Sequence, residues 1–260
     1  MDTRILALIA VAAPLVLMAP AAHAQFGPRG AGMGSPKGPP LSGAMTKLFG
    51  DHTGFSATLE MQTKLTNNPQ TVVVPGKLAF LEGKSRFEMD FTQAKGTGMR
   101  PEQAAQAKAM GMGEMIIISR PDKKLSYLVY PGFQSHVEQP LSEKEAGGAE
   151  AKYGIETAEL GKETVDGHPC VKNKVTVTDE QGRKYESTVW NATDLKNFPV
   201  KIESAQDSNP VTMSFKDIKL AKPDSGLFEP PAGSTKYADM MTMMREGMMK
   251  RMGAGAPPPK

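Results

Sequence analysis

Few residues of this chain have side chains suited to covalent chemistry. Cys170 is the single cysteine, and His168 precedes it by two positions. A catalytic thiol needs a base within hydrogen-bond reach and a third group that orients the base. Side chains two apart on a strand point the same way, but Pro169 intervenes and no partner motif accompanies the pair. The pattern favours a structural position, and we predict no catalytic residue.

Motifs for metals, phosphates and cofactors are also missing. His52, His136 and His168 lack the spacing of a zinc site. The chain has no glycine-rich phosphate loop and no Gly-x-Ser-x-Gly elbow. We therefore predict that the protein is not an enzyme and needs no cofactor.

Methionines near the C-terminus offer the other possible chemistry. They are Met240, Met241, Met243, Met244, Met248, Met249 and Met252. Thioethers suit cuprous ion, so Met240, Met241, Met243, Met244 and Met248 are candidate copper ligands of an envelope metal-handling or stress-related protein. On a helix, Met240, Met244, Met248 and Met252 would instead form a drifting stripe beside Met241 that docks on the sheet, a membrane or a protein partner. Gly247 and Gly253 weaken such a helix, so we expect a mobile tail that orders only on a partner.

The first 24 residues have the pattern of a signal peptide. Arg4 precedes the apolar stretch Ile5 to Leu17, and Ala22-His23-Ala24 is a cleavage pattern. No cysteine follows the cleavage site, so a lipid anchor there is not expected. We predict a soluble bacterial protein, secreted through the inner membrane into the periplasm.

Composition divides residues 25–260 into three parts. Residues 25–40 are rich in Gly and Pro and indicate a flexible linker. Residues 41–237 carry the strand pattern, and residues 238–260 are the methionine-rich tail. The net charge of +3 is not gathered into a basic stripe, so nucleic acid is excluded as a partner. One cysteine makes no internal disulfide, and we expect a monomer held together by its core.

The middle part reads as a meander of antiparallel strands. Apolar residues alternate along 54–61 and 85–91, as expected when one face is buried. Glu82-Gly83 separates strand 71–81 from strand 84–91 as a tight hairpin turn. Pro121-Asp122-Lys123 is the turn between a strand at 115–118 and a return strand at 125–129. Further strands are expected at 171–178, 185–189, 200–204 and 211–215.

Helical signal is sparse. Pro101 to Met110 has proline at a helix start and strong helix formers behind it, and 41–49 and 142–153 are weaker candidates. The fold class predicted is mainly β with a few short helices: a strongly curved antiparallel half-barrel with a helical lid.

If the apolar strand faces share one concave surface, they would line a ligand cavity. The candidates are Phe55, Leu59, Met61, Phe87, Met89, Phe91, Leu125, Tyr127, Val129, Tyr185, Val189, Met213 and Phe215. Phenylalanine and methionine are adaptable cavity liners. The alternative is an ordinary packed β core, because every half-buried sheet shows the same alternation.

Several segments together resemble a known family. They are Phe55-Ser56-Ala57, the hairpin from Ile118 to Leu128, Gly161 to Cys170, Val189-Trp190-Asn191, Phe198 to Lys201 and Leu227 to Gly233. In order and spacing these segments resemble an uncharacterised branch of the LolA/LolB-like, outer-membrane lipoprotein-sorting proteins, over about residues 41–237. The resemblance implies an unclosed, strongly bent sheet over a helical lid, with an apolar cavity that shelters acyl chains. We therefore expect a periplasmic, non-enzymatic binding protein for an apolar ligand, either a lipid or the acyl chains of a lipoprotein.

Overall fold

The computed structural model describes residues 43–65, 68–142, 145, 153–206 and 209–254. By its own contacts the chain divides into residues 1–36 and 37–260, and all the described residues belong to the second unit. The predicted signal peptide and linker, and most of the helix expected at 142–153, lie outside the described residues.

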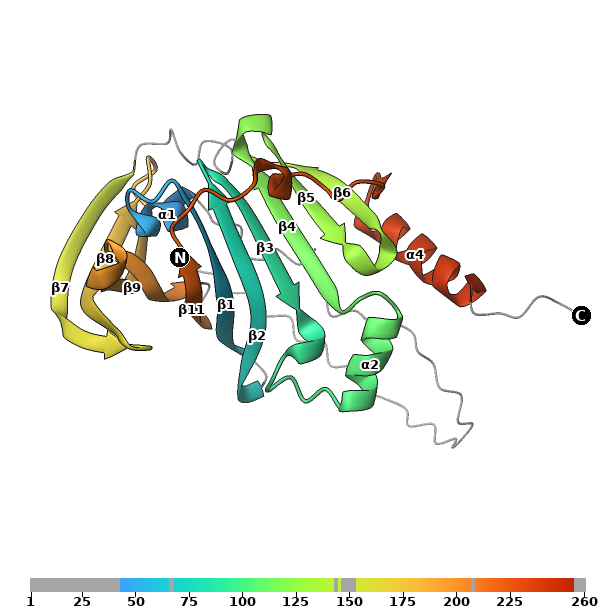
Figure 1. The fold of residues 1–260 in the computed structure, drawn as a ribbon, viewed down its shortest axis with the longest axis horizontal. Helices are drawn as coiled ribbons and strands as arrows, with labels where there is room; N and C mark the ends of the chain where they lie inside the picture. The colour runs from blue at the N-terminus through green and yellow to red at the C-terminus, as the bar shows by residue number, and fades with distance from the viewer. Residues whose placement is uncertain (1–42, 66–67, 143–144, 146–152, 207–208, 255–260) are drawn as a thin grey trace, which may run out of the picture. The chain divides into compact units, whose positions relative to one another are not determined.

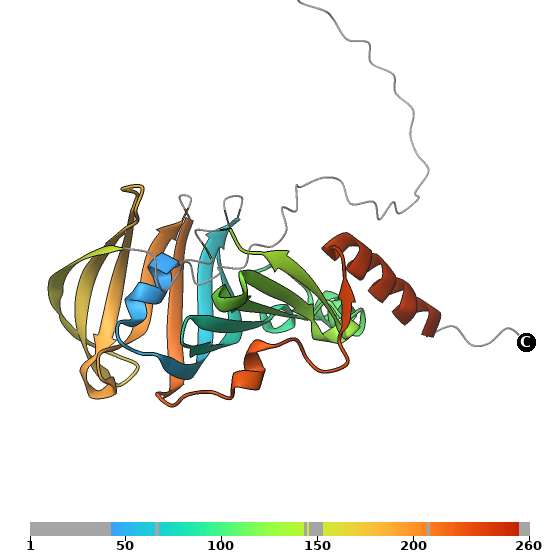
Figure 2. The ribbon, with the colours of Figure 1, turned by 90° about the horizontal axis from the view of Figure 1, so that it is seen from above.

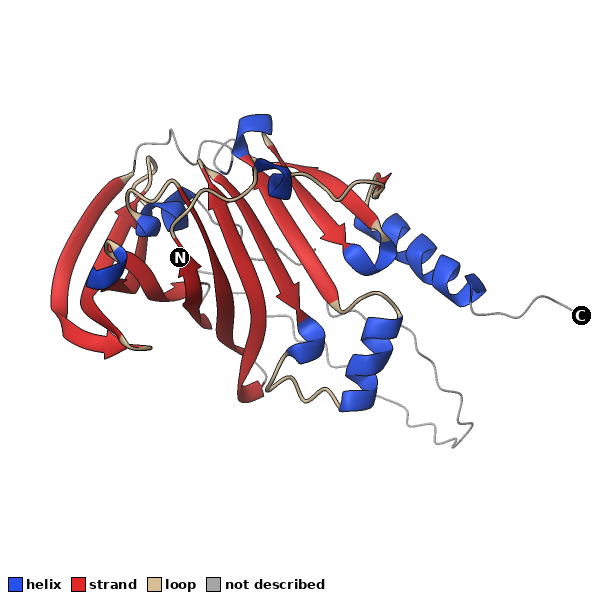
Figure 3. Ribbon diagram, viewed as in Figure 1, coloured by secondary structure: helices blue, strands red, loops and turns tan. Residues whose placement is uncertain are grey.

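The described residues form one large sheet accompanied by a few helices (Figure 3). Its strands are β1 (Gly54–Leu65), β2 (Asn68–Leu81), β3 (Lys84–Asp90), β4 (Glu114–Arg120), β5 (Leu125–Tyr130), β6 (Ser135–Pro140), β7 (Gly154–Val165), β8 (His168–Thr178), β9 (Lys184–Ala192), β10 (Phe198–Gln206), β11 (Asn209–Lys219) and β12 (Thr235–Tyr237). The helices are α1 (Gly43–Thr46), α2 (Pro101–Ala109) and α4 (Met240–Ala254), with 3-10 turns η1 (Lys47–Phe49), η2 (Phe91–Gln93), η3 (Pro121–Lys123), η4 (Pro131–Phe133), η5 (Thr193–Leu195) and η6 (Ser225–Phe228).

The strand order is β12-β6-β5-β4-β3-β2-β1-β11-β10-β9-β8-β7. Two meanders, β1 to β6 and β7 to β11, are therefore joined by the antiparallel pair β1–β11, and only the short β12 runs parallel to its neighbour β6. The sheet is strongly curved and is not closed into a barrel (Figures 1 and 2). The predicted fold class is confirmed.

The expected hairpins form where their turn residues allow them. Leu81 pairs with Lys84 across Glu82 and Gly83, whose φ angles are 50° and 85°. Positive φ at both central positions is the geometry of a tight hairpin, and glycine adopts it without steric cost. Helix α2 begins at the predicted proline, Pro101.

The two faces of the sheet are covered by different segments. We call the face that carries α1 and η1 the inner face. Phe49, 1% exposed, packs there with ring centroids 4.8 Å from Phe55, 5.8 Å from Phe198 and 5.7 Å from Phe215. This aromatic cluster fills the centre of the inner face with the protein's own side chains.

The outer face is covered by the crossing segment, residues 220–234, which leads from β11 back toward β6. Phe228 is fully buried with Ile118, Tyr127 and Val129. Arg120 donates to the backbone oxygen of Phe228 and pairs with Glu229. A hydrogen bond from Lys123 and the Arg120 charge lower the pKa of the Glu229 carboxyl.

The methionine-rich tail is a helix packed on the sheet over residues 240–254, so the structure shows the docking on the sheet that was one of the alternatives, and not the mobile tail. Met243 is fully buried in a cluster with Leu128, Tyr130 and Val137 on the inner face, at the end that carries β6. Met241 is 82% exposed. The buried side of α4 therefore runs through Met243 and Gly247, and the predicted stripe of Met240, Met244 and Met248 is only half-buried.

Candidate ligand-binding site

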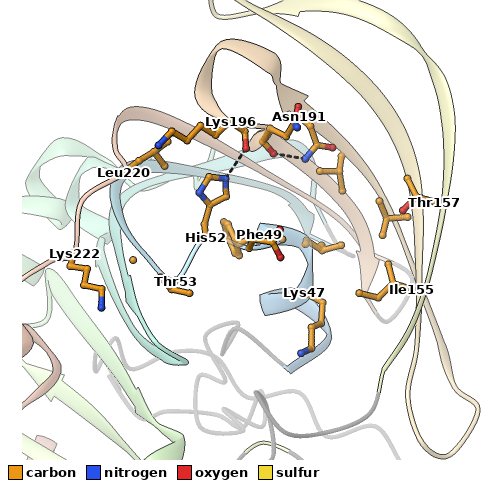
Figure 4. Close-up of a pocket in the computed structure, with 17 residues that line it drawn as sticks. Lys47, Phe49, His52, Thr53, Ile155, Thr157, Asn191, Lys196, Leu220 and Lys222 are labelled. Carbon is orange, nitrogen blue, oxygen red and sulfur yellow. Dashed lines mark hydrogen bonds between the residues drawn. The ribbon is translucent and has the colours of Figure 1, made fainter.

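A cavity lies between the η1 end of the inner-face helical segment and the strands β7 to β9. Its volume is about 710 Å³ (Figure 4). The lining residues come from the segment 47–54, from β7 to β9, from the turn after η5 and from the chain just after β11. They are Lys47, Leu48, Phe49, Gly50, Asp51, His52, Thr53, Gly54, Ile155, Thr157, Val175, Val189, Asn191, Lys196, Asn197, Leu220 and Lys222.

One wall is the segment from Lys47 to Gly54, and contacts with residues far along the chain fix its position. The 3-10 turn η1 ends at Gly50, whose φ is 58°. The chain then turns outward, and His52 lies 3.2 Å, Nε2 to oxygen, from the backbone carbonyl of Lys196. The His52 ring also packs edge-on against Phe198 at 5.3 Å between centroids. This wall is therefore tied to the β9–β10 turn as well as to the aromatic cluster.

The opposite wall is the edge strand β7. None of its residues is buried, and Ile155 is 50% exposed although it is apolar. Ile155 pairs with Val177, and Thr157 pairs with Val175, so Ile155 and Thr157 continue the inner face beyond β8. Val175 and Val189 form the apolar floor between the two walls. The exposed Ile155 side chain thus faces a space that no described segment fills.

The rim of the cavity is polar and carries more positive than negative charge. Lys47, Lys196 and Lys222 reach it, together with Asp51. The Lys222 ammonium donates to Glu82 at 2.6 Å, and this hydrogen bond lowers the pKa of the Glu82 carboxyl. The Lys47 ammonium lies 5.9 Å from the centroid of the Tyr153 ring. An apolar floor below such a rim fits a ligand with an apolar body and a polar end.

The structure divides the predicted cavity residues between three clusters. Phe55, Leu59, Phe87, Val189, Met213 and Phe215 are buried around Phe49, with Met61 and Tyr185 partly buried beside them. Met89 lies in the cluster that contains Met243, with Phe91 at its edge. Of all these residues only Val189 lines the large cavity.

Three of the predicted cavity residues lie on the wrong face for a shared surface. Tyr127 and Val129 pair with Ile118 and Ile116, and with Leu125 they pack under Phe228 on the outer face. Phe87 pairs with Ile117, whose side chain points to the other side of β4. Leu125, Tyr127 and Val129 are therefore core residues beneath the crossing segment.

Sequence reasoning missed most of the residues that line the cavity. The wall at Ile155 and Thr157 belongs to β7, which was not predicted as a strand. Lys196, Leu220 and Lys222 follow strands that were predicted, and Gly50 marks the turn after the predicted helix at 41–49. For the wall at residues 47–54, Gly50 was the one residue whose type indicated a turn.

The residues with possible chemistry are not arranged as a catalytic group. The Cys170 thiol is buried and donates to the backbone oxygen of His168 at 3.3 Å, and burial raises its pKa. The His168 imidazole contacts Asp194 instead, at 2.8 Å between Nδ1 and Oδ2. Among the described residues, no three His, Cys, Asp or Glu side chains gather as a metal site. In the same part of the chain, no helix is long and apolar enough to cross a membrane.

Comparison with known proteins gives one family model and several solved structures that match the chain. A family model described as a domain of unknown function, DUF4412, matches residues 76–198. No curated protein matches the chain.

The solved structures that match include a LolA superfamily protein from Nitrosomonas europaea (9% identity, 73% of this chain and 96% of that chain covered, TM-score 0.37). They also include LprF from Mycobacterium bovis (15% identity, 71% of this chain and 93% of that chain covered, TM-score 0.35). A third is the lipoprotein LppX from Mycobacterium tuberculosis (10% identity, 67% of this chain and 91% of that chain covered, TM-score 0.35).

Proposed function

We propose that the protein is a non-enzymatic binding protein for an apolar ligand, a lipid or the acyl chains of a lipoprotein. The observation that carries the proposal is the cavity of about 710 Å³ beside the filled centre of the inner face. Its volume lies within the range of about 300 to 1,000 Å³ that is typical of small-molecule sites.

The chemistry of the lining supports an apolar ligand held without a covalent bond. Leu48, Phe49, Ile155, Val175, Val189 and Leu220 supply apolar surface. Burying an apolar chain against them gains about 25 cal/mol for each Å² removed from water. The polar lining groups are amides, hydroxyls and ammonium groups at the rim, together with Asp51 and His52. They suit recognition of a polar end of the ligand.

The proposal includes a location. The signal peptide predicted from residues 1–24 would export the chain, and residues 25–40 would link the folded part to the new N-terminus. Apolar ligands that cross an aqueous compartment need a protein that shields them from water. The cavity beside β7 would meet this need in a periplasmic protein.

A matched pair of substitutions on β7 tests the cavity. Ile155 and Leu160 are both apolar and are 50% and 55% exposed, but only Ile155 lines the cavity. Ile155→Asp places a carboxylate beside the apolar floor, where a bound apolar ligand would remove it from water, and this desolvation is costly. We expect it to weaken binding of a fluorescent long-chain fatty acid at least tenfold, which is about 1.4 kcal/mol.

Leu160→Asp is the control and should change that affinity less than twofold. Both variants should keep the thermal midpoint of the parent, because neither side chain is buried. Equal affinity in Ile155→Asp and the parent protein would refute the assignment of the cavity. Native mass spectrometry of the protein purified from its own cells should also detect a bound lipid, and a ligand-free or purely polar complex there would argue against the function.

A further inference from the structure

Contacts at both ends of helix α4 fix its rotation about its own axis relative to the sheet. Met243 is fully buried, and a Cβ on Gly247 would lie 2.7 Å from the Phe133 ring. Near the end of the helix, Arg251 donates from Nε to the backbone oxygen of Gly132 at 3.0 Å and from Nη1 to that of Ala109. These contacts fix which methionines of the helix face the sheet and which face water.

The flank beside the docked side carries a row of methionines. Met241, Met244 and Met248 are three and four residues apart, so their side chains are neighbours on one side of the helix. Met241 is 82% exposed, and Met244 and Met248 are half-buried. We call these three residues the methionine row. Met243 points into the core and Met249, 53% exposed, lies on another side of the helix.

Three adjacent thioethers form a donor set for a soft monovalent cation. Thioether sulfur is neutral and polarisable, and it selects Cu(I) over hard cations such as Mg²⁺ or Ca²⁺. The row spans about 10 Å along the helix axis at a rise of 1.5 Å per residue. Methionine has three rotatable bonds, so Met241 and Met248 can lean toward the central Met244.

We infer that the methionine row binds one soft monovalent cation, Cu(I) or its analogue Ag(I), through the sulfur atoms of Met241, Met244 and Met248. This site is separate from the ligand cavity and does not depend on it. Arg245 lies one helical turn from Met241. A guanidinium group has no lone pair to offer a cation, so Arg245 cannot act as a ligand and its positive charge weakens the site.

Substitution of leucine for methionine tests the inference directly. Leucine keeps the apolar volume and the helix propensity but removes the sulfur. Titration of the purified protein with Ag(I) in chloride-free buffer should give one tight site per chain, and competition with a chromophoric Cu(I) chelator should give the same stoichiometry. The triple variant Met241→Leu, Met244→Leu, Met248→Leu should lose at least a hundredfold in affinity at an unchanged thermal midpoint.

Three further variants locate the site. Met249→Leu and Cys170→Ser should bind as the parent protein does, within twofold, since neither residue belongs to the row. Arg245→Gln should bind a few-fold more tightly because a repelling charge is removed. A parent protein that binds no Ag(I), a triple variant that binds normally, or a loss of binding in Met249→Leu or Cys170→Ser would each overturn the inference.

Discussion

Replacing Gly247 with alanine tests how α4 is seated on the sheet. Alanine favours a helix interior over glycine by about 1 kcal/mol. A Cβ at this position, however, would lie 2.7 Å from Cγ and 2.8 Å from Cδ1 of Phe133, closer than such atoms approach. Overpacking of this kind costs about 1–3 kcal/mol. The net effect of Gly247→Ala should therefore be a loss of up to about 2 kcal/mol in the stability of the docked helix.

Gly253→Ala is the matched control. Among the described residues, no atom outside its own helix and chain neighbours lies within 4 Å of its would-be Cβ, so the same substitution should gain up to about 1 kcal/mol without a clash. Amide hydrogen exchange over residues 240–254 reports the free energy of local opening. We expect faster exchange in Gly247→Ala and slower exchange in Gly253→Ala, and Phe133→Leu should relieve part of the defect in a double variant. Equal protection in the two alanine variants would refute the contact between Gly247 and Phe133.

Two further predictions concern single polar groups. Burial acts to raise the pKa of the Asp179 carboxyl, but hydrogen bonds from the Arg183 backbone and side chain hold it at about 2. A depressed carboxyl pKa stabilises the fold above the ordinary value of 3.8 and loses this effect as the pH falls toward 2. Asp179→Asn should therefore flatten acid unfolding between about pH 4 and pH 2, and an unchanged profile by circular dichroism would count against the assignment. The buried Cys170 thiol should react with a thiol reagent orders of magnitude more slowly in the native than in the unfolded protein, and fast native labelling would contradict its burial.

Turns were the part of the fold that the sequence predicted well. The pair Glu82-Gly83 gives a tight hairpin because its geometry depends on the turn residues themselves. Pro121 to Lys123 likewise forms η3 between β4 and β5. Local chemistry decides such elements, so these two hairpins could be predicted without knowledge of the packing.

Strand β7 could not be predicted because it has no buried face. Periodicity identifies a strand only when one face is apolar, and the sequence from Gly154 to Val165 alternates in no such way. Its position comes from pairing with β8, with a register shift between Glu159 and Gly161. The wall of the candidate cavity formed by β7 therefore could not be predicted from the sequence.

The prediction of which face of the sheet the apolar residues of β5 occupy was wrong for a different reason. Alternation shows that Leu125, Tyr127 and Val129 share a side, but it does not say which side of the sheet this is. The neighbouring strand offers no guidance, because Ile116, Ile117 and Ile118 are apolar in succession. The outer face becomes a core only because Phe228, more than ninety residues away in sequence, covers it.

Helix α4 shows the same dependence on distant residues. Gly247 suggested an unstable tail because glycine weakens an isolated helix. In the structure the missing side chain is what lets the helix approach Phe133. Glycine does have a low helix propensity, but the tertiary contact with Phe133 decides the structure here.

The central seam between β1 and β11 has a consequence for how the chain folds. Each meander is built from neighbouring strands, but the seam joins partners such as Thr58 and Asp217, which are 159 residues apart and share a hydrogen bond of 2.9 Å. Pairing at such separation must wait for a long loop to close, which slows folding. The two meanders can therefore acquire structure early and independently, whereas the cavity between residues 47–54 and β7 to β9 is completed only when the seam forms. A ligand of the proposed cavity would therefore bind only chains whose folding is complete.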